Sequence, residues 1–134
     1  MRPREMRVEV KSSRDILRAR RQARELARQL GFVGSQVARI AAATSEVARN
    51  IVEYAAKGEI MFQSLSQGRR QGLLITARDE GPGIADIGRA MQYGYSTGHR
   101  LGAGLPGARW LMDEFEIASK PGRGTTIRMK KWLN

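Results

Sequence analysis

The strongest constraint on the fold is a change of hydrophobic period at Gly58. Before it, apolar or small residues recur at spacings of 3, 4, 3, 4 and 3, which is typical of a helix with one core-facing stripe. The stripe consists of Val37, Ile40, Thr44, Val47, Ile51 and Tyr54. After it, Ile60, Phe62 and Leu65 lie in one strand-like run and 73–77 in another, with QGRRQG as the turn between them. The pattern therefore predicts a helix followed by a β-hairpin.

The rest of the chain supplies further helices and strands. Alternation over 6–10 predicts a strand, and a Ser pair then leads into SRDILRARRQARELARQL, a helix that Gly31 should cap. Gly34 and Ser35 open the second helix, and Gly58 should end it. The remaining expected elements are at most one short helix at 86–91, a helix at 105–112 with Pro106 in its first turn, and strands at 116–119 and 125–131 joined by KPGRG.

These elements do not alternate strictly between strand and helix, so a doubly wound parallel sheet is excluded. We expect a two-layer α+β sandwich with helices on one face of a mixed sheet. A length of 134 residues corresponds to one domain, 1–134.

Composition narrows the function classes. The chain has no Cys and a single His, His99, which excludes thiolate metal sites, cysteine nucleophiles and histidine clusters. No signal peptide or membrane span is expected, so the sequence predicts a cytoplasmic protein with no membrane partner. The net charge of +11 fits a solvated basic surface, an acidic protein partner or nucleic acid, but an aromatic content of 6% offers few platforms for bases. Nucleic acid is therefore disfavoured.

Two polar residues flank the core stripe of the second helix. Glu46 and Asn50 lie on the same side of the stripe and four residues apart, so a carboxylate and an amide could face one ligand. The plain alternative is a solvated helix flank.

Glycine-rich segments follow the helix. Asp79 ends a strand, and Gly81 and Gly83 in DEGPG would let the backbone approach a flat ligand, although an Asp and Gly turn explains the same residues. LGAGLPG opens a helix, whose N-terminus favours phosphate. PGRGTT places Thr125 at the start of a strand, where a simple hairpin turn is the alternative.

In this order, SEVARN, DEGPG, LGAGLPG and GRGT resemble the N, G1, G2 and terminal G-T boxes of the GHKL ATP-binding superfamily. The strings ATSEVARNIVEYAAKG, DEGPGIADI, GYSTG and LGAGLPGARWLMDEFEI look like the stressosome switch kinases of the RsbT type. The resemblance implies a Bergerat-type fold that binds ATP and Mg²⁺ and phosphorylates Ser or Thr on STAS-domain proteins of a stressosome. It also implies that the released kinase activates a downstream phosphatase by binding it.

Box by box, the resemblance implies roles for individual residues. Asn50 would coordinate Mg²⁺ between the phosphates, and Glu46 would be the base that receives the substrate hydroxyl proton. Asp79 would bind the adenine amino group, with Gly83 beside the ring and Thr125 supporting the pocket. The nucleotide site would further include Gly81, Ile84, Gly102, Ala103, Gly104 and Leu105, of which the last four would wrap the phosphates.

The segment 93–100 would be a lid over the nucleotide. His99 and Arg100 stand where small residues are expected, and Arg100 either neutralises the γ-phosphate or simply projects from the lid. The alternatives to a protein kinase are an ATPase or sensor-kinase catalytic domain of the same superfamily, an anti-sigma-type sequestering protein, and a basic nucleic-acid-binding module.

Overall fold

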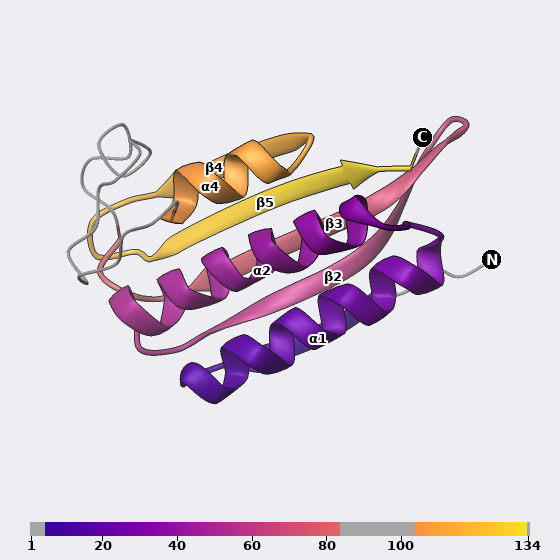
Figure 1. The fold of residues 1–134 in the computed structure, drawn as a ribbon. Coiled ribbons are helices and arrows are strands. Elements are labelled where there is room, and N and C mark those ends of the chain that lie inside the picture. The colour runs from indigo at the N-terminus through magenta and orange to yellow at the C-terminus, as the bar shows by residue number, and fades with distance from the viewer. Residues whose placement is uncertain (1–4, 84–103, 134) are drawn as a thin grey trace.

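The computed structural model describes residues 5–83 and 104–133, and these form one layer of helices on one five-stranded sheet (Figure 1). The sheet order is β1-β2-β3-β5-β4. The elements are β1 (Glu5–Val10), α1 (Ser13–Leu30), α2 (Ser35–Tyr54), β2 (Gly58–Gln67), β3 (Arg70–Asp79), α4 (Gly104–Leu111), β4 (Glu114–Ser119) and β5 (Thr125–Trp132). The predicted α+β class with helices on one face is confirmed.

The sheet differs from the expected mixed sheet, because every neighbouring pair of its strands is antiparallel. Two hairpins, β2–β3 and β4–β5, account for two of the pairs. Two successive helices separate β1 from β2, so the chain reverses direction three times between these strands and β2 runs antiparallel to β1. β3 and β4 do run in the same direction, but β5 lies between them.

The core lies between the helices and one face of the sheet. In α2, Ile40, Val47 and Ile51 are at most 1% exposed, as the stripe predicted. Tyr54, the last residue of both the predicted stripe and the helix, is instead 40% exposed. The three buried residues face side chains such as Phe62 and Ile75, which are fully buried on β2 and β3. Each such aliphatic or aromatic side chain contributes about 1.5–3 kcal/mol by leaving water, so this stripe holds α2 against the sheet.

Helix α1 ends as its sequence predicts. Gly31 has a φ of 103°, in the left-handed region, and its N–H donates to the carbonyl of Arg28. At the other end Ser12 is the N-cap by its extended backbone but makes no side-chain capping bond. The carboxylate of Asp15 instead accepts a hydrogen bond of 2.8 Å from the Lys11 N–H, so Asp15 secures the entry into α1.

The end of α2 corrects one expectation. The helix stops at Tyr54, and Gly58 starts β2 instead of ending the helix. A Cβ on Gly58 would lie 2.5 Å from the carbonyl oxygen of Arg78 on the neighbouring strand. The glycine is therefore required by strand packing. The turn itself is made by Ala55 and by Ala56, which has a positive φ of 69°.

The other predicted boundaries hold to within a few residues. α4 begins at Gly104 instead of Leu105, and β4 begins at Glu114 instead of Glu116. The short helix expected at 86–91 lies outside the described residues. Across 5–83 and 104–133, none of the helices has the length and apolar character to cross a membrane.

Candidate functional site

Three polar side chains are buried along α2, and they differ in how they are satisfied. The hydroxyl of Thr44 donates to the carbonyl of Ile40 at 2.8 Å, and that of Ser45 donates to Ala41 at 3.1 Å. Asn50 is 8% exposed, yet its amide makes no hydrogen bond within the described part of the chain. Leaving a buried amide unpaired costs about 1–3 kcal/mol, so this position favours a group that the described residues do not supply.

Glu46 lies one turn before Asn50 on α2. Its side chain is 18% exposed and its Oε1 lies 3.7 Å from an Nη1 atom of Arg49. The carboxylate is thus partly withdrawn from solvent beside a cation.

Asp79 lies at the end of β3, on the face of the sheet that the helices cover. Its Oδ1 accepts hydrogen bonds from the backbone N–H of Gly81 at 2.9 Å and of Thr125 at 3.2 Å. The residue is 8% exposed, and its Oδ2 has no partner among the described residues. One oxygen therefore organises the protein backbone, while the other can accept a hydrogen bond from a ligand.

The glycines of DEGPG are explained first by the protein's own packing. A Cβ on Gly83, whose φ is +80°, would lie 2.1 Å from the Lys120 carbonyl oxygen. A Cβ on Gly81 would lie 2.6 Å from the Cβ of Ala55 at the end of α2. On the opposite turn, a Cβ on Gly124 would lie 2.1 Å from the Asp79 carbonyl oxygen. The N–H of Gly122 donates to the Pro82 carbonyl at 2.7 Å. The two turns therefore interlock beside the Asp79 carboxylate.

Thr125 is held by a residue that the sequence interpretation missed. The Oγ atoms of Thr125 and Ser119 lie 2.7 Å apart, and the Ser119 hydroxyl also donates to the Gly124 carbonyl. Ser119 and Thr125 face each other across the β4–β5 pair. Counting outward from the five-residue KPGRG turn would have placed them opposite each other.

Gly104 and Leu105 begin α4, the helix that packs against α2. Gly104 has a φ of +51°, which favours glycine there, and Leu105 is 5% exposed. Ile84, Gly102 and Ala103, like the expected lid at 93–100 with His99 and Arg100, lie outside the described residues. Within 5–83 and 104–133, no group of three or more acidic or histidine side chains could hold a metal ion by itself.

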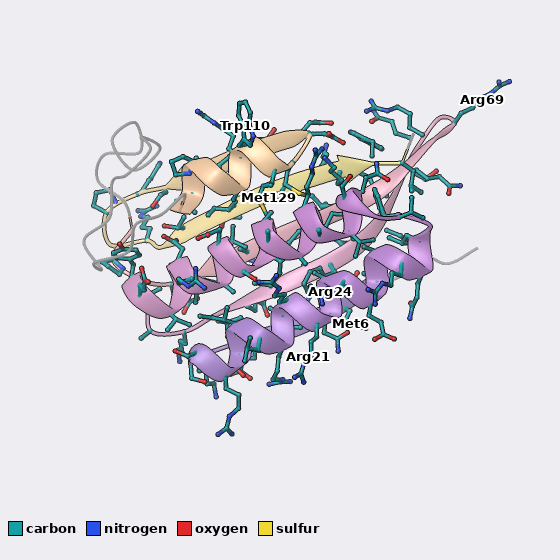
Figure 2. All side chains as sticks on the ribbon, in the orientation of Figure 1. Met6, Arg21, Arg24, Arg69, Trp110 and Met129 are labelled. Atoms are coloured by element: carbon teal, nitrogen blue, oxygen red, sulfur yellow. The ribbon has the colours of Figure 1, made fainter. Side chains whose placement is uncertain are left out.

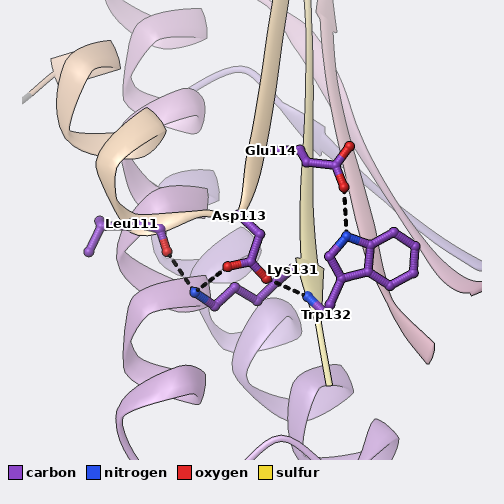
Figure 3. A network of polar contacts seen from close by, with 5 residues as sticks. All are labelled: Leu111, Asp113, Glu114, Lys131 and Trp132. Carbon is purple, nitrogen blue, oxygen red and sulfur yellow. Dashed lines mark hydrogen bonds and ion pairs between the residues drawn. The ribbon is translucent and has the colours of Figure 1, made fainter. Parts of the chain in front are cut away.

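A second polar cluster ties the end of α4 to β5 (Figure 3). The ammonium group of Lys131, which is 6% exposed overall, donates to the Leu111 carbonyl at 3.2 Å and lies 3.3 Å from Asp113 Oδ1. The other oxygen of Asp113 accepts the Trp132 N–H at 2.8 Å, and the Trp132 indole donates to Glu114 at 2.6 Å. Lys131 therefore satisfies the carboxyl end of α4, which the helix dipole favours.

An open hollow of about 670 Å³ lies at the same end of the sheet as Asp79. Its lining consists of Gly58 and of charged residues from the strands and turns, among them Asp79, Arg7, Glu9 and Arg78. Asn50, Glu46 and Thr125 do not line this hollow. Of the buried polar side chains described above, Asp79 alone lines the hollow.

Comparison with known protein families shows to which family the chain belongs. Residues 11–131 match the family described as Histidine kinase-like ATPase domain. The chain belongs to this family. The resemblance of its four boxes to the GHKL superfamily is thereby confirmed, and membership implies an ATP-binding domain.

Named relatives specify the branch. The chain is 48% identical over 126 residues to Serine/threonine-protein kinase RsbT of Bacillus subtilis (strain 168), covering 94% of this chain and 95% of the relative. It is 34% identical over 113 residues to an Anti-sigma F factor of Thermoanaerobacter sp. (strain X514), covering 80% and 78%. The predicted enzyme class, an RsbT-type protein serine/threonine kinase, is confirmed at this level of similarity.

Solved structures share the fold. The structure of the RsbU and RsbW domains of Rv1364c from Mycobacterium tuberculosis matches with a TM-score of 0.67 at 21% identity. That match covers all of this chain and 34% of the longer one. The mycobacterial sensor histidine kinase MprB matches with a TM-score of 0.57 at 14% identity, covering 98% and 96%.

Proposed function

We propose that the chain uses ATP and Mg²⁺ to phosphorylate Ser or Thr on STAS-domain proteins of a stressosome-like complex in the cytoplasm. After release it binds and activates a downstream phosphatase. The proposal extends the kinase assignment to substrates and partners. The observation that carries its chemistry is the pair of unsatisfied buried acceptors and donors at one end of the helical layer, Asn50 and the Oδ2 of Asp79.

These residues suit a nucleotide that carries a metal ion. An adenine amino group offers the donor that Asp79 Oδ2 lacks, and the amide oxygen of Asn50 is a ligand that Mg²⁺ accepts. When bound, Mg²⁺ would neutralise charge on the phosphates. Thr125, whose hydroxyl oxygen lies 2.7 Å from that of Ser119, holds the Oδ1 of Asp79 through its backbone N–H.

The chain's other residues would position the nucleotide and take the proton from the substrate hydroxyl. The Glu46 carboxylate would take the proton of the substrate hydroxyl, since it lies on α2 one turn from Asn50 and is partly shielded from water. Gly104 and Leu105, with Gly102 and Ala103, would surround the phosphates at the start of α4, where free N–H groups favour anions. Gly81, Gly83 and Ile84 would complete the adenine side.

The test is transfer of label from γ-labelled ATP to a purified STAS-domain protein, with and without Mg²⁺. We expect label on a Ser or Thr of the partner, and we expect Asn50→Ala to raise the Mg²⁺ concentration needed for half-maximal transfer. Thr44→Ala is a matched control, because Thr44 is buried on the same helix with its hydroxyl already bonded. Label that appears equally without Mg²⁺ would remove the metal from the proposal.

The 34% identity to anti-sigma F factors supports one rival, a protein that acts by sequestering its partner. The same experiment separates the two functions. Sequestration predicts a stable complex with a partner that gains no label, and that outcome would overturn the proposed substrate class.

A further inference from the structure

A second recessed surface lies at the opposite end of the helical layer from Asn50. It is a groove of about 400 Å³ between the second half of α1 and the start of α2. Its lining consists of Arg24, Arg28, Phe32, Val33, Gly34, Val37 and Ala38, which we call the α1–α2 groove. Its volume falls within the range of about 300–1,000 Å³ typical of ligand sites.

The floor and rim of the α1–α2 groove differ in chemistry. Phe32 and Val37 are 2% and 6% exposed and form an apolar base, whereas Val33 beside them is 71% exposed. Arg28 is exposed at the rim, and Arg24 is half-buried. An occupant therefore needs an apolar group for the floor and negative charge for the rim.

The rim continues into a basic face along α1. The helix carries six arginines and two acidic residues, and at 100° per residue the arginines fall within an arc of about 160°. Figure 2 labels Arg21 and Arg24 on this helix. Among the described residues, only Arg18 of the six pairs with a carboxylate, Asp15 at 3.1 Å. The others, including Arg24 and Arg28, offer charge that no carboxylate in the described part of the chain neutralises.

We propose that the α1–α2 groove docks an acidic helical segment of a protein partner through an apolar anchor side chain. An amphipathic segment supplies both requirements at once, with the anchor against Val33 and Val37 and carboxylates against Arg24 and Arg28. Nucleic acid supplies the charge, but the groove has no exposed aromatic ring on which a base could stack, because Phe32 is buried.

The groove is separate from the candidate site. Asn50 lies sixteen residues after Gly34 along α2, and at a rise of about 1.5 Å per residue the two are about 24 Å apart. A docked segment would therefore leave ATP binding unchanged. The proposal does not depend on the kinase function, since docking and transfer are measured separately.

The probe is a short fluorescent helical peptide of Glu and Leu, with Leu at i, i+3 and i+4 spacing. Anisotropy should show binding, and amide shifts in NMR spectra should move at Val33, Gly34 and Val37. Replacing the probe's Leu by Ser, or its Glu by Lys, should weaken binding by about tenfold or more. A single-stranded DNA and a DNA duplex of similar charge are the nucleic-acid probes.

Two variants and two matched controls locate the binding. Arg28→Glu and Val33→Ser should each weaken peptide binding by about tenfold, because one removes the charge at the rim and the other the exposed apolar contact. Arg69→Glu reverses a charge at the β2–β3 turn (Figure 2), and Met6→Ser removes an exposed apolar side chain on β1. Neither control should change the affinity by more than about twofold.

Three outcomes would overturn the docking proposal. In the first, the peptide does not bind at millimolar concentration. In the second, Arg28→Glu and Arg69→Glu weaken peptide binding equally. In the third, DNA binds more tightly than the peptide, and Arg28→Glu abolishes this DNA binding. The last would assign the groove to nucleic acid. ATP affinity, measured on the same variants, should be unchanged.

Discussion

The two ends of β5 carry polar clusters that differ in one respect. At its end, Lys131, Asp113 and Trp132 satisfy one another, and Lys131 also donates to the Leu111 carbonyl at the end of α4. At its start, Thr125 and one oxygen of Asp79 are bonded, but Asp79 Oδ2 is left without a partner among the described residues, as is the side chain of Asn50 on α2. Six polar or charged side chains are buried in the described part, and only Asn50 makes no hydrogen bond there.

This difference separates architecture from recognition. A closed cluster gains nothing from a ligand, so its worth is stability. An open cluster costs stability until something binds, so it persists where binding is selected. Substitutions at the two ends should therefore affect different measurements.

The largest effect is expected at Glu46. Glu46→Gln keeps the size of the side chain but removes the proposed base, so single-turnover transfer to the STAS-domain partner should slow by about 10²-fold or more. ATP affinity should change little. Glu53→Gln, an exposed change later on the same helix, is the control. Full transfer in the Glu46 variant would show that the carboxylate is not the base.

Asp79→Asn sharpens the comparison within one side chain. The asparagine oxygen can still accept the N–H groups of Gly81 and Thr125, so the fold should persist. Its NH₂ group would replace Oδ2 and present a donor to the adenine amine, which should cost about 1–3 kcal/mol, or five- to 150-fold in ATP affinity by calorimetry. Glu80→Gln is the exposed neighbouring control. An unchanged affinity would take Asp79 out of the site.

The closed cluster should respond in the opposite manner. Asp113→Ala leaves the Trp132 N–H and the ammonium of Lys131 each without one partner. Because Asp113 is partly exposed, we expect a loss of about 1–2 kcal/mol in the free energy of unfolding by urea titration. Glu116→Ala, exposed on β4, should cost less than about 0.5 kcal/mol. If the Asp113 variant lost ATP affinity but no stability, the division between the two ends would fail.

The smallest effect tests the cost of the open end. Asn50→Ala removes the unpaired amide and adds a better helix former, and the lost volume offsets part of this gain. In the absence of nucleotide, we expect the free energy of unfolding to rise by about 0.5–1 kcal/mol. Thr44→Ala removes the hydrogen bond from the Thr44 hydroxyl to the Ile40 carbonyl on the same helix, so it should lower the free energy of unfolding. A destabilised Asn50 variant would indicate a structural role for this amide.

Local patterns predicted the elements well. The stripe from Val37 to Ile51, the Gly31 cap and the β2–β3 hairpin depend on residues close in the sequence, and the structure has them as expected. Strand pairing was harder, because inserting β5 between β3 and β4 depends on packing across the whole sheet. The α+β class was therefore predictable, and the antiparallel pairing was not.

The candidate site divides along the same line. Asn50, Asp79 and Thr125 could be named because each stands in a recognisable local string, although their roles remain predictions. Ser119 and Arg49 gain importance only through neighbours that folding or helix geometry brings near. The interlock of Gly83 and Gly124 with the turns opposite them likewise follows from contacts more than thirty residues apart in sequence.

The interlocked turns also determine how activity screens of this protein should be understood. A substitution at Gly83 or Gly124 would place a Cβ against a backbone carbonyl of the opposite turn. If such a variant loses kinase activity, the cause will be that the two turns no longer pack together. Such positions will score as essential even in a chain that has no substrate. A proteolysis or expression screen run in parallel will separate them from Asn50, where loss of activity should accompany a protein that is folded and abundant.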